Sequence, residues 1–193
     1  MAVELQLLQK FTTSLHPLDQ EEMEAFTGVW QPFSCKRKTV LTAAGETERH
    51  LYFVIEGVQR CFYLGDRGEA TLIFTYPYSF SGIIDSFLTG TPSPYFLETL
   101  TASRFLRTTQ GQMNNLMETF PSIRHFVLKA TAFALKGVLE RQVELQCFSA
   151  EEKFRQLLSR SPHVLGLIPH KYLASYLGID AATFSRLLSS VRI

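Results

Sequence analysis

A short run near the end of the chain holds the side chains best suited to contacting nucleic acid. Thr183, Ser185 and Arg186 share the first half of a predicted helix. An arginine fork can bond two acceptors on a guanine edge, and hydroxyls can bond phosphates or bases. His170 and Lys171 begin the preceding predicted helix, where backbone amides and the helix dipole favour an anion. The alternative for these positions is ordinary solvent exposure.

The elements that would position these side chains form a helix-turn-helix pattern over residues 169–188. Pro169 suits a first helical position, and Gly178 allows a sharp turn between two helices. Ala174 is small where the helices would cross, and Asp180 can cap the second helix. The apolar residues on the inward faces are Leu173, Leu177, Phe184, Leu187 and Leu188. The alternative is a helical hairpin that only closes a domain.

Composition and charge narrow the class of protein. With 193 residues and 46% hydrophobic content, the chain can bury one large core or two modest ones, and we expect two domains. The formal net charge is +1, but residues 1–113 hold nine Lys/Arg against twelve Asp/Glu, whereas residues 149–193 hold six against three. The basic excess coincides with the helix-turn-helix pattern, although it also fits an ordinary charged surface.

Cysteine usage and the first residues indicate the compartment. Cys35, Cys61 and Cys147 are widely spaced and odd in number, and the start of the chain lacks the basic and apolar regions of a signal peptide. No apolar run approaches the roughly 20 residues that span a bilayer. The cysteines and histidines also lack the spacing of metal ligands. We expect a cytoplasmic protein without a metal or cofactor.

The chain before residue 114 carries two kinds of pattern. Residues 1–30 have apolar positions at helical spacing, with a break at 17–19. From Lys38 to Thr109 the period is two, and glycines separate short β-branched and aromatic runs. Short strands with glycine turns predict a closed or rolled antiparallel sheet.

After Met113 the pattern is helical again and predicts one long helix that begins at Pro121. Phenylalanines alternate with alanine and glycine along one face, which would let a second helix approach closely in a parallel dimer. The alternative is burial against the chain's own sheet, and both can hold on different faces. The residues of the expected seam are Ile123, Phe126, Ala130, Phe133 and Gly137.

A capping box from Ser149 to Glu152 predicts that a new helix begins there. A domain boundary near residue 147 follows. The expected units are a sensor domain with N-terminal helices over 1–113, a dimerisation helix over 114–147, and a helix-turn-helix domain over 148–193.

This order of rolled sheet, long helix and helix-turn-helix resembles the cyclic-AMP receptor and fumarate-nitrate regulator (Crp/Fnr) family of bacterial transcription regulators. The motifs that carry the resemblance, over nearly the whole chain, are Gly45–Glu46, Leu51–Gly57, Phe80–Gly82, Pro121 and Lys153–Leu158. The resemblance implies an α+β fold. Its parts are an antiparallel β-roll of the cyclic-nucleotide-binding, jelly-roll type with flanking helices, a long dimerisation helix and a small helical DNA-binding domain.

The resemblance also implies where a cyclic nucleotide would bind, and the polar residues of that site are replaced. Family members place a glutamate and an Arg-Ser pair around the ribose and phosphate, at the positions of Ile83, Ser93 and Pro94 here. The pair that reads adenine corresponds to Val138 and Leu139. A desolvated cyclic phosphate needs a charged, preferably bidentate partner, so we expect no useful binding of cyclic AMP.

Two alternatives remain at this site. Arg104 or Arg107, on a following strand, could supply the missing charge. Otherwise the altered pocket holds an uncharged apolar molecule or closes into a packed core. The residues expected around it are Gly82, Ile83, Ile84, Ser93, Pro94, Tyr95, Val138 and Leu139.

At the DNA end, the resemblance implies that the helix from Ala181 enters the major groove. Two base readers of the cyclic-AMP receptor are replaced by Ala181 and Ala182, whereas the arginine at Arg186 is retained. Base contact would rest on Arg186, aided by Thr183 and Ser185, with alanine methyls available to thymine. The chain ends at Ile193, which leaves no residues for the β-wing of the family. We expect a wingless head that needs two half-sites.

The leading hypothesis is a homodimeric transcription regulator of the Crp/Fnr type that binds double-stranded DNA and does not respond to cyclic AMP. RNA polymerase and an apolar small molecule are further candidate partners. The alternative is a degenerate β-roll dimer that binds an apolar ligand or a protein without reading DNA. The chain lacks a nucleophile elbow, a phosphate loop and a metal-binding helix motif, so we expect no enzyme. The iron–sulfur branch of the family needs four suitably placed cysteines and this chain has three, so we expect no metal sensing.

Overall fold

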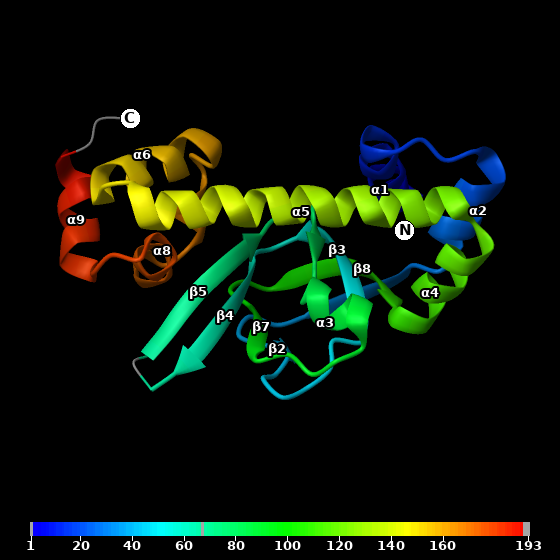
Figure 1. Cartoon of the computed structure of the whole chain (residues 1–193), viewed down its shortest axis with the longest axis horizontal. Coiled ribbons are helices and arrows are strands. Elements are labelled where there is room, and N and C mark those ends of the chain that lie inside the picture. The colour runs from blue at the N-terminus through cyan, green and yellow to red at the C-terminus, as the bar shows by residue number, and fades with distance from the viewer. Residues whose placement is uncertain (1, 67, 191–193) are drawn as a thin grey trace.

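The long helix α5 (Pro121–Cys147) organises the molecule in the computed structural model, which describes residues 2–66 and 68–190. The N-terminal helices lie at one end of α5, the C-terminal helices lie at the other end, and the strands lie along one side (Figure 1). The predicted start at Pro121 is confirmed. Proline suits this position because its missing N–H would have no helical partner there.

Two helices precede the strands, as the apolar spacing predicts. They are α1 (Ala2–Leu15) and α2 (Gln20–Gly28). Asp19 ends the break between them because its carboxylate accepts the Glu22 amide at 2.9 Å, and the Glu22 side chain bonds back to Asp19. Leu8 and Phe26 are buried in a cluster that also includes Ile123 and Phe126 of α5.

The strands form two four-stranded antiparallel sheets, which confirms the predicted β-roll. The first sheet has the order β1 (Gln31–Cys35), β8 (Ser103–Thr109), β3 (His50–Glu56) and β6 (Phe80–Ser81). The second has the order β2 (Val40–Thr42), β7 (Tyr95–Thr99), β4 (Gln59–Gly65) and β5 (Gly68–Thr75). The alternating pattern missed β1, whose Pro32 is tolerated because β1 lies at a sheet edge.

Two short helices connect the sheets to the rest of the chain. α3 (Ile84–Thr89) follows β6, and α4 (Gln110–Thr119) leads into α5. Thr109 and Gln112 form a capping box that begins α4 at Gln110, three residues before Met113, from which the sequence pattern predicts helix.

The C-terminal helices, which we call the head, are α6 (Ala150–Arg160), α7 (Val164–Leu167), α8 (His170–Leu177) and α9 (Ala181–Ser190). The capping box at Ser149 and Glu152 is confirmed. The core of the head is continuous with three residues of the roll, Val58, Phe74 and Leu100. The head is therefore packed against the roll as well as joined to it through α5.

Candidate nucleic-acid interface and ligand site

The turn between α8 and α9 explains why residue 178 is glycine. Gly178 has φ +64°, a left-handed conformation that glycine adopts without a steric penalty. The amide of Ile179 donates to the Ala174 carbonyl at 3.1 Å, which closes the end of α8. A Cβ atom at residue 178 would also lie only 3.3 Å from Leu145 of α5. The turn thus brings the head close against the end of the long helix.

Asp180 caps α9, as the sequence predicts. Its carboxylate accepts the amide and the hydroxyl of Thr183, both at 2.8 Å. These hydrogen bonds lower the pKa of Asp180. Because the Thr183 hydroxyl already donates to the cap, it is less free to donate to DNA than its position in the sequence indicates.

The other predicted contacts to DNA lie on the surface of the head. Ala181, Ala182, Ser185 and Arg186 are exposed on α9, whereas Phe184 and Leu187 turn inward. His170 and Lys171 are exposed at the beginning of α8, and the His170 ring lies 5.3 Å from the ring of Phe184. Arg186 forms no ion pair within the part of the chain that the structure describes.

A buried arginine links the head to α5. Arg141 donates to Glu144 at 2.8 Å and to the Tyr176 carbonyl, and its guanidinium lies 4.2 Å from the Tyr176 ring. Arg160 of α6 also donates to Glu144. These hydrogen bonds tie the C-terminal part of α5 to α6 and α8.

The residues expected to line the ligand pocket lie in different parts of the structure. Ile83 is 2% exposed and packs inside the roll with Tyr52, Cys61 and Phe105. Ile84 belongs instead to the cluster beneath the N-terminal helices. Tyr95 is half-buried beside the interior of the roll, Gly82 adopts φ +145° where the loop leaves β6, and Pro94 is exposed.

Ser93 is buried, but its polar atoms have partners. Its amide donates to the Glu46 carbonyl at 2.9 Å, and its hydroxyl accepts the Tyr95 amide at 3.1 Å. Val138 and Leu139 are more than half exposed on α5, and neither belongs to the cluster that holds Ile83. The eight predicted residues thus do not line one common pocket in the described chain. A polar groove of about 550 Å³ lies beside Ser93 instead, and residues between 41 and 50 line it, among them Glu46, Glu48 and Arg49.

The carboxylate of Glu48, which the sequence patterns did not single out, lies at the start of the loop that follows β6. Glu48 is 1% exposed and accepts the Thr42 hydroxyl at 2.8 Å, the His50 amide at 3.1 Å and the Ile83 amide at 3.3 Å. Burial raises its pKa, although these hydrogen bonds oppose the shift. Only a fold that brings residues 42, 50 and 83 together could reveal this role.

The two alternative arginines differ in their surroundings: Arg104 forms ion pairs on the outside, whereas Arg107 stacks on Phe33, which packs against the cluster that holds Ile83. Arg104 pairs with Glu4 at 2.8 Å and with Glu56 at 3.6 Å on the outside of the molecule. The guanidinium of Arg107 lies 4.1 Å from the Phe33 ring.

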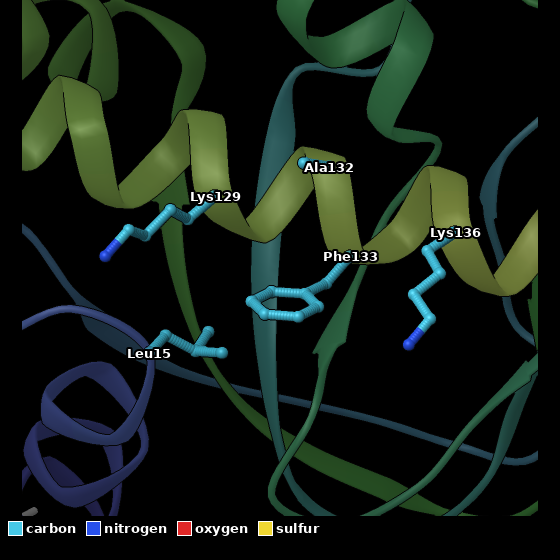
Figure 2. A pocket seen from close by; sticks show the side chains of 5 residues that line it. All are labelled: Leu15, Lys129, Ala132, Phe133 and Lys136. Carbon is cyan, nitrogen blue, oxygen red and sulfur yellow. The ribbon is translucent and has the colours of Figure 1, made fainter.

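The predicted dimer seam needs correction in part. Ile123 and Phe126 are buried in the chain's own core, because the first turns of α5 pack beneath α1 and α2. Ala130 is half-buried, and Gly137 and Phe133 are exposed. Phe133 and Leu15 face the same groove of about 390 Å³ between α5 and the end of α1 (Figure 2).

A different face of α5 is uncovered. Leu128, Leu135 and Leu139 are 64%, 57% and 57% exposed, and Ala132 lies between them. Their successive spacings of four, three and four residues are those of a heptad seam. All residues from 132 to 140 are exposed, so the middle of α5 is not used by the chain's own packing.

Comparison with known proteins defines the class of this domain. Residues 32–120 match the family model of the cyclic nucleotide-binding domain. The roll is therefore similar to domains of the cyclic-nucleotide-binding type. No curated protein sequence matches the chain.

The fold of the chain is similar to that of several solved structures. FixK2 from Bradyrhizobium japonicum has a TM-score of 0.74 at 19% identity, with 83% of each chain covered. Catabolite activator protein from Thermus thermophilus has a TM-score of 0.57 at 22% identity, covering 91% of this chain and 84% of the other. A Crp/Fnr-family protein from Eubacterium rectale has a TM-score of 0.69 at 16% identity, covering 89% and 82%. The resemblance that the sequence predicts is confirmed at the level of the fold.

Within residues 2–66 and 68–190, no three His, Cys, Asp or Glu side chains are grouped as a metal site. Among the described helices, none is both long and apolar enough to cross a membrane.

Proposed function

We propose that the chain is a DNA-binding transcription regulator of the Crp/Fnr type, with α9 as the helix that enters the major groove. The observation that carries the proposal is the uncovered surface of α9. Its apolar side packs into the head, while Ala181, Ala182, Ser185 and Arg186 remain free. A helix-turn-helix needs such a free surface at the beginning of its second helix. Phosphate contacts would come from His170 and Lys171.

The exposed stripe on α5 supports a homodimer. Leu128, Ala132, Leu135 and Leu139 form an apolar seam that a second copy of α5 could cover in parallel. The two heads of the dimer would then bind two DNA half-sites that lie about one turn of the double helix apart. In this proposal residues 1–113 act as the sensor domain, 114–147 as the dimerisation helix and 148–193 as the DNA-binding domain, and the protein works beside bacterial DNA in the cytoplasm.

The roll is proposed not to bind cyclic AMP. Ile83, which stands at the position of the family's glutamate, is apolar and buried, and its amide already donates to the Glu48 carboxylate. Arg49 lines the polar groove beside Glu48, but neither Ser93 nor Pro94 supplies the charged partner that a cyclic phosphate needs. Calorimetry with cyclic AMP should show no binding at micromolar concentrations, and a micromolar Kd would contradict this part of the proposal. Binding of RNA polymerase and binding of an apolar effector remain predictions from the sequence.

Salt dependence tests the proposed function. The full chain should bind a labelled 30-base-pair duplex, and the logarithm of its binding constant should fall linearly with the logarithm of salt concentration. Enrichment of defined sequences from a pool of randomised duplexes would separate specific reading from general attraction. Absence of binding at low salt would favour the alternative of a roll dimer that does not read DNA.

A further inference from the structure

The groove between α5 and the end of α1 combines apolar side chains with two positive charges. Leu15 of α1 and Ala132 and Phe133 of α5 supply the apolar surface, and Lys129 and Lys136 complete the lining. Its volume of about 390 Å³ falls in the range of about 300–1,000 Å³ that is usual for small-molecule sites. None of these five residues is among those expected to hold a cyclic nucleotide.

The apolar part of the groove is open to a ligand. Phe133 is more than half exposed, and its ring faces the same space as Leu15, with Lys129 and Lys136 extending on either side of the ring (Figure 2). The methylene stems of the two lysines add apolar surface beside the ring while their ammonium groups stay in water. An alkyl chain laid along this surface would remove it from water, which is favourable.

The two lysines lack a strong negative partner. The Nζ atom of Lys129 lies 3.2 Å from Nδ1 of His16, and an ammonium group only donates, so this contact brings no negative charge to Lys129. Among the described side chains, no carboxylate pairs with Lys129. Lys136 pairs with Glu140 at 3.7 Å, but both side chains are exposed, and such pairs contribute little.

A second copy of α5 would not supply the missing carboxylate. Lys129 and Lys136 each follow a leucine of the exposed seam, so they take the e positions of the heptads in the proposed parallel dimer. An e position faces a g position of the other helix, and the residues at those positions are Arg124 and Thr131. The negative charge that this groove can accept therefore comes from a separate molecule.

We propose that the groove binds the anion of a medium-chain fatty acid, with its carboxylate against Lys129 and its alkyl chain along Phe133 and Leu15. The lysines alone would accept any anion, and the apolar surface alone would accept any alkyl chain. Their combination in one groove selects a molecule that carries both. The site lies within one chain and outside the roll, so the proposal does not depend on DNA binding by the head.

Calorimetry with decanoate tests the proposal on the full chain, below the concentration at which decanoate forms micelles. We expect saturation at one decanoate per chain. Octanoate has two fewer methylene groups, and each buried methylene contributes about fourfold, so octanoate should bind up to about 15-fold more weakly. Decyltrimethylammonium carries a similar chain with a positive charge and should not bind. Absence of saturable decanoate binding, or equal binding of the cation, would overturn the proposal.

Variants of exposed residues locate the site without disturbing the core. Lys129→Met keeps the length of the side chain and removes its charge, so decanoate should bind about fivefold more weakly, the upper value for an exposed ion pair. Phe133→Ala should reduce the difference between decanoate and octanoate. Lys10→Met is the matched control, because Lys10 is an exposed lysine of α1 that does not line the groove. Equal weakening by Lys10→Met and Lys129→Met would show general attraction of anions and overturn the site.

Discussion

The carboxylate of Glu48 accepts a hydrogen bond from the backbone amide of Ile83 at 3.3 Å, and it thereby joins the turn before β3 to the loop after β6. The same carboxylate accepts the Thr42 hydroxyl and the His50 amide. Three donors from separate parts of the roll thus depend on one buried acid.

Glu48→Gln should destabilise the roll. An amide NH2 would face a donor where the carboxylate accepts one, so a buried N–H or O–H would lose its partner, at a cost of about 1–3 kcal/mol. Urea unfolding of the two proteins measures the difference. Glu46→Gln is the matched control, because Glu46 is exposed and, among the described residues, its side chain accepts a hydrogen bond only from the nearby Ala43 amide. An equal effect of both substitutions would contradict this role of Glu48.

The effect of Glu48→Gln should depend on pH. Burial raises the pKa of Glu48 above its unfolded value of 4.5, so the folded state holds the proton more tightly than the unfolded state. This contribution to stability is complete below pH 4.5 and is lost as pH rises through the folded pKa. The difference in unfolding free energy between the unmodified chain and Glu48→Gln should therefore narrow from pH 4.5 towards neutrality. Urea unfolding at a series of pH values measures it, and a difference that widens with pH would contradict the assignment.

Leu135→Asp and Leu139→Asp should separate the proposed dimer. Each places a charge on the exposed seam of α5, where a second copy would have to bury it. Sedimentation velocity should show a shift towards monomer with little change in circular dichroism. Leu167→Asp, the same change on an exposed leucine of α7, should leave the oligomeric state unchanged.

Ile123→Ala should act differently from the seam substitutions. Ile123 is fully buried in the chain's own core, so its truncation should lower the unfolding free energy by about 2–5 kcal/mol. Thermal or urea unfolding measures this loss. If Ile123→Ala instead shifted the oligomeric state and left stability unchanged, the dimer seam predicted from the sequence, which includes Ile123, would be right.

Arg186→Ala should lower specific DNA binding by about 1–3 kcal/mol, which is the usual value of a bidentate base contact. The measurement compares a selected duplex with a random one in a mobility-shift assay. Arg155→Ala is the control, since Arg155 is an exposed arginine of the head that pairs with Glu151 of α6. Equal discrimination in both variants would remove Arg186 from base reading.

Gly178→Ala should destabilise the head, whereas Gly166→Ala should not. The left-handed conformation at Gly178 costs an L-residue about 1–2 kcal/mol, and the added methyl would press on Leu145. Gly166 has open space around it, so alanine there should be neutral or slightly stabilising. Urea unfolding followed by circular dichroism compares the two, and equal stability would contradict the constraint at Gly178.

Local patterns determined the elements that depend on near neighbours. Ser149 and Asp180 cap helices, and Gly178 ends one, through contacts within a few residues, so their roles follow from the sequence. The alternating strands and the long helix followed from period alone. The sequence pattern did not predict β1, because proline, here Pro32, is typical of loops and is tolerated only in edge strands.

Which face of α5 is buried was decided only by the tertiary structure. Apolar residues lie on more than one face of this helix, so spacing could not show that Ile123 and Phe126 belong to the core while Leu135 and Leu139 are free. The same holds for Glu48, whose donors come from three separate segments, and for Ser175, which meets Thr71 across 104 residues of sequence. The spacing of apolar residues in the sequence predicts whether a segment is a helix or a strand. Which residues a side chain contacts depends on how distant elements pack together.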